Sequence, residues 1–89
     1  MAPAQSLYEK VVVVSTEYLG PAAERFIRRQ IDTHLGIKPE ALSVTDLPEL
    51  FSWIRLTFAL LTENQDVIEA FMQDLEKLAK KQHLKAGNR

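Results

Sequence analysis

The sequence predicts an all-α protein, folded as a small antiparallel bundle of four or five helices. Hydrophobic residues recur at helical spacing in four segments, and helix-capping and helix-ending residues separate these segments. No two strand-like stretches are available to pair with each other. Because 89 residues suffice for one small domain, we expect a single helical domain over residues 1–89, with frayed ends at 1–5 and 83–89.

The first predicted helix runs from about residue 7 to residue 18. Ser6 and Glu9 fit a capping box, in which both side chains satisfy backbone amides at the start of a helix. Gly20 and Pro21 supply a stop, because glycine adopts a left-handed cap and proline cannot continue the turn. The four valines at 11–14 favour a strand by local propensity. A helix is still preferred, since a lone strand would leave its backbone groups unpaired.

The second predicted helix runs from Pro21 to Leu35 and closes on Gly36. Proline suits the first position of a helix, where its missing amide costs nothing. Apolar side chains lie along one stripe of this segment and charged side chains along the other. The link at 37–45 is expected to be an ordered loop with one short helical turn opened by Pro39.

The third predicted helix, at 47–61, is the most apolar segment of the chain. Either Thr45 or Asp46 is a suitable cap for its start. Its apolar residues cover nearly the whole circumference, so this helix needs neighbours on several sides. The fourth helix is expected to begin at a cap formed by Thr62 or Asn64 and to end near Lys81.

Composition limits the classes of function. Eleven basic and twelve acidic residues leave a formal charge of −1, which gives no global attraction to nucleic acid or to anionic lipid. The absence of cysteine excludes a disulfide framework and thiolate metal sites, and it fits a reducing, cytoplasmic location. The longest apolar stretch is shorter than the ~20 residues of a membrane span, and the first residues lack a signal-peptide pattern.

No constellation of catalytic or metal-binding residues is recognisable. His34 and His83 are the two histidines, and neither stands at a metal-ligand spacing from other ligands. No Ser/His/Asp set is identifiable, and the paired carboxylates of the last helix have no apolar pocket to shift their pKa values. We therefore expect no enzymatic activity, no cofactor and no metal.

The third helix carries more apolar surface than a small bundle would cover. Trp53, Leu56 and Leu60 stand opposite the residues expected in the core, and Val12 and Val13 are candidates to extend the same surface. A helix that is simply central in the domain is the alternative reading. The sequence thus predicts a non-catalytic protein-protein interaction or oligomerisation module, acting as a homodimer or with a protein partner, with Trp53 as an aromatic anchor.

A cationic cluster supports an alternative function. Arg25, Arg28 and Arg29 follow the Gly-Pro turn, and the four-residue spacing puts Arg25 and Arg29 on one side of the helix, where they suit a carboxylate or phosphate. Glu24 and Asp32 each lie four residues from Arg28, so a face of local ion pairs also accounts for this charge. Binding to nucleic acid or to another anionic surface is therefore the second hypothesis.

Two further alternatives rest on other segments. The basic tail, which includes Lys80 to Lys85, is a candidate for anionic surfaces, but it lacks the interleaved aromatic residues of single-strand binders, so nucleic acid is disfavoured. The same charges also complement a helix macrodipole. Four aromatic residues are candidates to line a pocket for a small hydrophobic ligand between helices: Phe51, Trp53, Phe58 and Phe71.

One segment resembles a known module. The segment Glu17-Tyr18-Leu19-Gly20-Pro21-Ala22-Ala23 and the following Ile27-Arg28-Arg29 are similar to a small helical module at the C-terminal ends of some bacterial serine/threonine kinases and signalling proteins. In that module an aromatic-aliphatic-Gly-Pro turn precedes an amphipathic helix that ends in basic residues. The resemblance implies a regulatory or docking role in bacterial signalling. It implies no catalytic role, because the chain contains no kinase motif.

Overall fold

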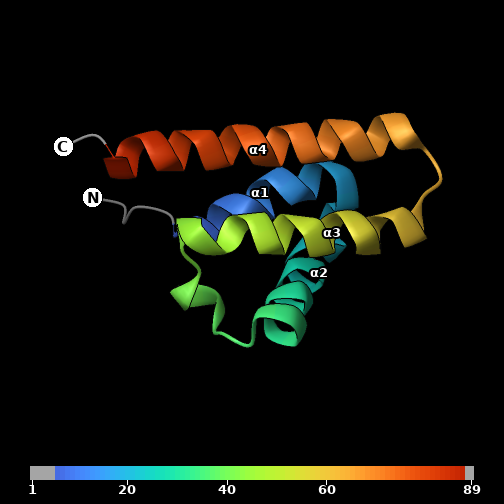
Figure 1. The fold of residues 1–89 in the computed structure, drawn as a ribbon. Coiled ribbons are helices and arrows are strands. Elements are labelled where there is room, and N and C mark those ends of the chain that lie inside the picture. The colour runs from blue at the N-terminus through green and yellow to red at the C-terminus, as the bar shows by residue number, and fades with distance from the viewer. Residues whose placement is uncertain (1–5, 88–89) are drawn as a thin grey trace.

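The structure, a computed structural model, describes residues 6–87 and the side chains of residues 6–82. It contains α1 (Leu7–Leu19), α2 (Ala23–Gln30), α3 (Leu47–Leu61) and α4 (Gln65–Gly87) (Figure 1). Short 3-10 turns lie at Gly20–Ala22, Pro39–Ala41 and Val44–Asp46, and a π-helical turn spans Ile31–Leu35. The described residues include no strand, so the prediction of an all-α protein is confirmed.

The helices are joined more closely than the sequence predicts. No non-helical residue separates α1 from α2, and α2 passes directly into the π-helical turn, so residues 7–35 form one continuous helical run. With 44–61 and 65–87, the described chain holds three long helical runs instead of four or five separate helices. The bend inside the first run lies at Gly20, whose φ of 62° is in the left-handed region that favours glycine.

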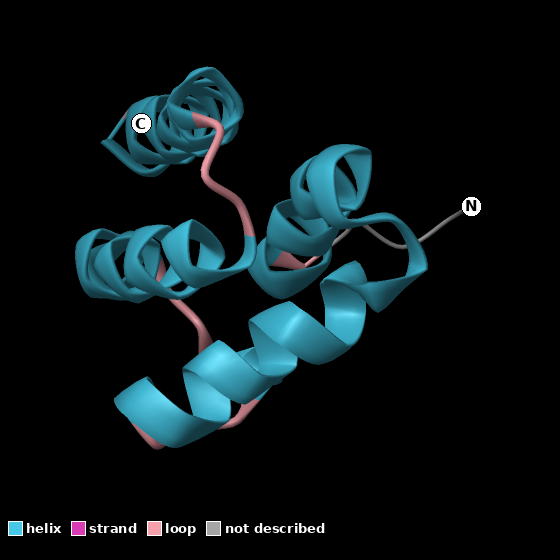
Figure 2. Cartoon of the chain, turned by 90° about the vertical axis from the view of Figure 1, so that its right-hand side faces the viewer, coloured by secondary structure: helices cyan, strands magenta, loops and turns pink. Residues whose placement is uncertain are grey.

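The helices pack around a common centre. α4 lies along both α1 and α3 and runs antiparallel to them, and α3 and α4 are joined by the short link at 62–64 (Figure 1). Figure 2 shows α1, α3 and α4 nearly end-on, while α2 crosses below them. The chain therefore departs from a regular up-and-down arrangement at α2, which turns away where Gly20 bends the first run.

Phe71 of α4 lies in the middle of the core. Its ring stacks on Tyr18 of α1 with centroids 4.8 Å apart and meets Phe58 of α3 edge-on at 5.1 Å. These contacts join three helices through one side chain, in geometries that aromatic pairs prefer. The aliphatic residues that are also fully buried come from every helix: Val11, Ile27, Ile31, Leu47, Leu50, Ile54, Ile68 and Leu75.

The predicted caps of α1 and α4 are present. Ser6 Oγ accepts from the Glu9 amide at 3.1 Å, and the Glu9 carboxylate accepts from the Ser6 amide at 2.9 Å, which confirms the capping box. At α4 the Asn64 side chain accepts from the Val67 amide at 3.2 Å. Asn64 is therefore the cap of α4, in preference to Thr62.

The predicted cap of α3 is wrong. Asp46 makes no capping bond to α3, and its carboxylate instead accepts from the Ser43 amide at 3.0 Å. Ser43 and Asp46 thus form a capping box at the 3-10 turn Val44–Asp46, which leads into α3. Thr45 has no capping role there. The short turn predicted at Pro39 is present as Pro39–Ala41.

The end of α4 lies beyond its predicted position near Lys81. The helix continues through Gly87, the last residue that the structure describes. Residues 83–87, which belong to the segment predicted to fray, have a helical backbone in the structure. Residues 1–5 and 88–89, also predicted to fray, lie outside the described residues.

A hydrogen bond to a carboxylate ties α1 to α4. The Tyr18 hydroxyl donates to Oδ2 of Asp74 at 2.5 Å. This bond and partial burial favour the protonated phenol, and they raise the pKa of Tyr18 to about 12. The folded chain therefore holds this proton more tightly than the unfolded chain, in which tyrosine keeps its ordinary pKa of about 10.

Replacing Tyr18 by phenylalanine is expected to change the alkaline stability profile. In the wild type the contribution of this proton is complete below about pH 10 and is lost as the pH rises toward about 12. The Tyr18→Phe variant has no such contribution to lose, so urea midpoints measured at about pH 9 and about pH 11 should differ less than in the wild type. An equal loss of stability in both proteins would contradict this assignment.

Candidate interaction surface

α3 buries one side and exposes the other. Its buried residues are Leu47, Leu50, Phe51, Ile54 and Phe58. Three leucines in its C-terminal half are exposed, and we call them the α3 leucine patch: Leu56 at 60%, Leu60 at 85% and Leu61 at 62%. Two of the three predicted surface residues of α3, Leu56 and Leu60, therefore face solvent. The alternative of a fully central helix does not describe α3.

The segment that carries the α3 leucine patch is uncharged. Residues 56–62 contain no acidic or basic side chain, and the exposed Ala59 lies between Leu56 and Leu60 along the helix. Arg55 is the nearest charged residue in the sequence, and its guanidinium pairs with Glu69 of α4. The charge of Arg55 is thus compensated by a carboxylate of the neighbouring helix.

Trp53 is less available than the sequence suggests. Its ring lies flat on the imidazole of His34, with centroids 3.8 Å apart and an interplanar angle of 4°, and it is half-buried. Nearby, Thr57 Oγ1 donates to Oε1 of the buried Gln30 at 3.1 Å. α2 and the π-helical turn therefore cover α3 along Trp53 and Thr57. Trp53 borders the α3 leucine patch but already has a partner within the chain.

The two valines of α1 differ in exposure. Val12 packs against the core, whereas Val13 is 55% exposed. Val13 lines a shallow groove between α1 and α4 to which α3 contributes no residue. The structure therefore places Val13 beside α4, and the extension of the α3 surface by Val12 and Val13 stays a prediction.

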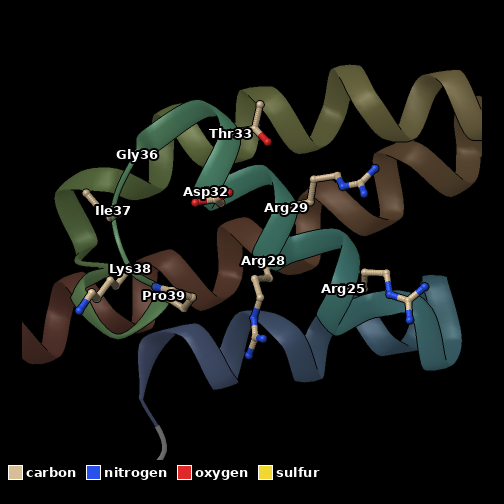
Figure 3. A pocket seen from close by; sticks show the side chains of 9 residues that line it. All are labelled: Arg25, Arg28, Arg29, Asp32, Thr33, Gly36, Ile37, Lys38 and Pro39. Atoms are coloured by element: carbon tan, nitrogen blue, oxygen red, sulfur yellow. The ribbon is translucent and has the colours of Figure 1, made fainter.

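The arginine cluster lines a separate hollow of about 510 Å³ on α2 (Figure 3). Arg25, Arg28 and Arg29 contribute to it, and Lys38 joins them from the loop after the π-helical turn. Asp32 is the one carboxylate in its lining. The structure therefore brings the three predicted arginines to one place and adds a lysine that helical spacing does not reveal.

The four aromatic residues predicted to line a pocket lie in different surroundings. Phe58 and Phe71 lie in the core, and Trp53 lies against His34. Phe51 instead lines an open groove of about 1010 Å³ between the start of α3 and α4, together with Leu47, Pro48, Met72 and Ala79. Sequence reasoning missed this groove because it depends on how α3 and α4 pack against each other, which local periodicity does not specify.

The basic tail and the sequence-based expectations about membranes and metals concern the rest of the chain. Of the basic tail, Lys80 and Lys81 are exposed on α4, whereas the side chains from His83 onward lie outside the described ones. In the described part of the chain no helix is long and apolar enough to cross a membrane. Residues 6–82 also contain no group of three or more metal-ligand side chains.

No protein family matches the chain, and neither a curated protein nor a solved structure was found to be similar to it.

Proposed function

We propose that this protein is a non-catalytic interaction module in which the α3 leucine patch joins two copies of the chain into a homodimer. The observation that carries this proposal is the exposure of Leu56, Leu60 and Leu61 on a helix whose other side forms the core. Burying a large aliphatic side chain stabilises a contact by ~1.5–3 kcal/mol. Clustered exposed apolar residues are typical of protein contact sites.

A second copy of the chain is a suitable occupant because it presents the same surface. In a two-fold arrangement with antiparallel α3 helices, Leu56 of one copy meets Leu60 of the other, and the contact occurs twice. The small side chain of Ala59 lets the two helices approach closely. A formal charge of −1 per chain gives two copies little mutual repulsion.

We also propose that this module has a regulatory role. We infer that the helices act as one small antiparallel bundle, because α1, α3 and α4 share the contacts of Phe71. The resemblance of residues 17–29 to a module of bacterial kinases and signalling proteins supports a role in intracellular signalling. The absence of cysteine is in keeping with a cytoplasmic location.

An engineered cysteine tests whether the α3 helices face each other. The natural chain has no cysteine, so a single Ala59→Cys substitution introduces one thiol. A disulfide requires Cα atoms roughly 4.4–6.8 Å apart, which only a face-to-face contact of α3 with α3 would supply. We expect mild oxidation to convert Ala59→Cys into a covalent dimer with twice the 10.1 kDa mass of the chain.

The matched control is Ala70→Cys, because Ala70 is also exposed but lies on α4. This variant is expected to form little covalent dimer under the same conditions. Equal crosslinking of the two variants would show random collision and would contradict the proposed dimer.

A further inference from the structure

The hollow on α2 concentrates positive charge on a chain that is slightly negative overall. Four cationic residues and one carboxylate line it, while the whole chain has a formal charge of −1. The hollow also contains apolar surface from Ile37 and Pro39, which are half-buried. None of the leucines in the α3 leucine patch lines it.

One arginine of this hollow is held in place by neighbours in the chain. Glu24 Oε2 accepts from Nη2 of Arg28 at 3.2 Å and from the Tyr8 hydroxyl at 3.3 Å. The local ion pair expected for Arg28 is thus present, with Glu24 and not Asp32 as its partner. Arg28 is therefore partly neutralised before any ligand arrives.

Arg25 and Arg29 differ from Arg28. Both are exposed, and neither makes an ion pair with any side chain between residues 6 and 82. Figure 3 shows both side chains extending to the same side of α2, with Lys38 on the loop across the hollow. Two guanidinium groups on adjacent turns can donate to the oxygens of carboxylates in a fixed geometry.

We propose that this hollow binds an acidic peptide segment of a partner protein, with Arg25 and Arg29 as the principal carboxylate contacts. The cationic side chains point in different directions around α2, so one small anion cannot reach all of them, whereas an extended segment with several carboxylates can. Ile37 and Pro39 offer contact to an apolar side chain of the same segment. The proposal goes beyond the proposed dimer and does not depend on it.

Charge and composition favour a peptide over a nucleic acid. No aromatic residue lines the hollow, so it offers no platform for stacking bases. The residues outside the hollow are acidic on balance, because the whole chain is at −1, and they would repel a long polyphosphate. A short acidic segment can contact the hollow alone.

Fluorescence anisotropy with a defined probe tests this site. The probe is a fluorescein-labelled hexapeptide of four glutamates and two leucines, and its counterpart has glutamines in place of the glutamates. The Arg25→Gln/Arg29→Gln variant is expected to bind the acidic probe about tenfold more weakly than the wild type. The Lys77→Gln/Lys81→Gln variant loses the same charge from exposed positions on α4 and should bind within about twofold of the wild type.

Several results would overturn the proposal. They are the absence of any preference for the acidic over the glutamine peptide, an equal loss of affinity in both double variants, and tighter binding of a thymidine oligonucleotide of equal charge. Thermal unfolding of the two variants shows whether they are folded; both pairs are exposed, so similar transitions are expected. Repeating the titration with Leu60→Asp separates this site from the proposed dimer, because the affinity for the acidic probe should not change.

Discussion

Replacing Phe71 by alanine is expected to lower the free energy of unfolding by about 3–5 kcal/mol. The phenyl ring is fully buried and touches the rings of Tyr18 and Phe58, so its removal leaves a cavity where α1, α3 and α4 meet. A domain of 89 residues has a total stability of about 4–13 kcal/mol. The variant is therefore expected to lose a large part of its stability.

Urea unfolding followed by circular dichroism measures this loss. Wild type and variant are compared at one protein concentration, because the proposed dimer would add to the apparent stability. Val13→Ala is the matched control: it also truncates an apolar side chain on a helix, but Val13 is exposed, and a change within about 0.5 kcal/mol is expected. A similarly small change for Phe71→Ala would contradict the central position of this ring.

Replacing Leu60 by aspartate is expected to weaken dimerisation by at least about 100-fold. The proposed two-fold contact would contain Leu60 twice, so each dimer of the variant would bury two carboxylates in an apolar surface. Leu60 is 85% exposed within one chain, and the variant should therefore keep its helical signal. Trp53 is the single tryptophan and borders the patch, so its fluorescence reports association when the protein is diluted.

Val13→Asp provides the matched control for Leu60→Asp. It places the same charge at another exposed apolar residue, outside the α3 leucine patch, and the response of Trp53 to dilution should persist. The proposed contact is wrong if Val13→Asp and Leu60→Asp weaken association equally. Trp53→Asp is a poorer test, because it also removes the stack on His34 and so acts on the fold of one chain.

Local signals explain why much of the helical structure could be predicted from sequence. The capping box of Ser6 and Glu9 and the left-handed Gly36 each depend on a few consecutive residues, and both occur where predicted. The predicted range of α3, 47–61, also agrees with the structure. The backbone geometry of such caps is determined by residues that lie close together in the sequence.

The features that sequence did not reveal depend on tertiary arrangement. The half-burial of Trp53 requires α2 to cross α3 so that His34 reaches the indole ring. The separation of Val13 from Leu60 depends on how α1 is rotated about its own axis, and Lys38 joins the arginines only because the loop folds back beside α2. Helical periodicity identifies which residues share a face, but it does not identify which faces meet.

Light scattering during size-exclusion chromatography tests the proposed homodimer most directly. In a series of dilutions, we expect the wild type and Val13→Asp to have about twice the 10.1 kDa mass of the chain at high concentration. The double variant Leu56→Asp/Leu60→Asp is predicted to have the mass of one chain throughout while keeping its helical signal. A wild type that stays at 10.1 kDa at every concentration would contradict the dimer, as would a double variant that remains dimeric.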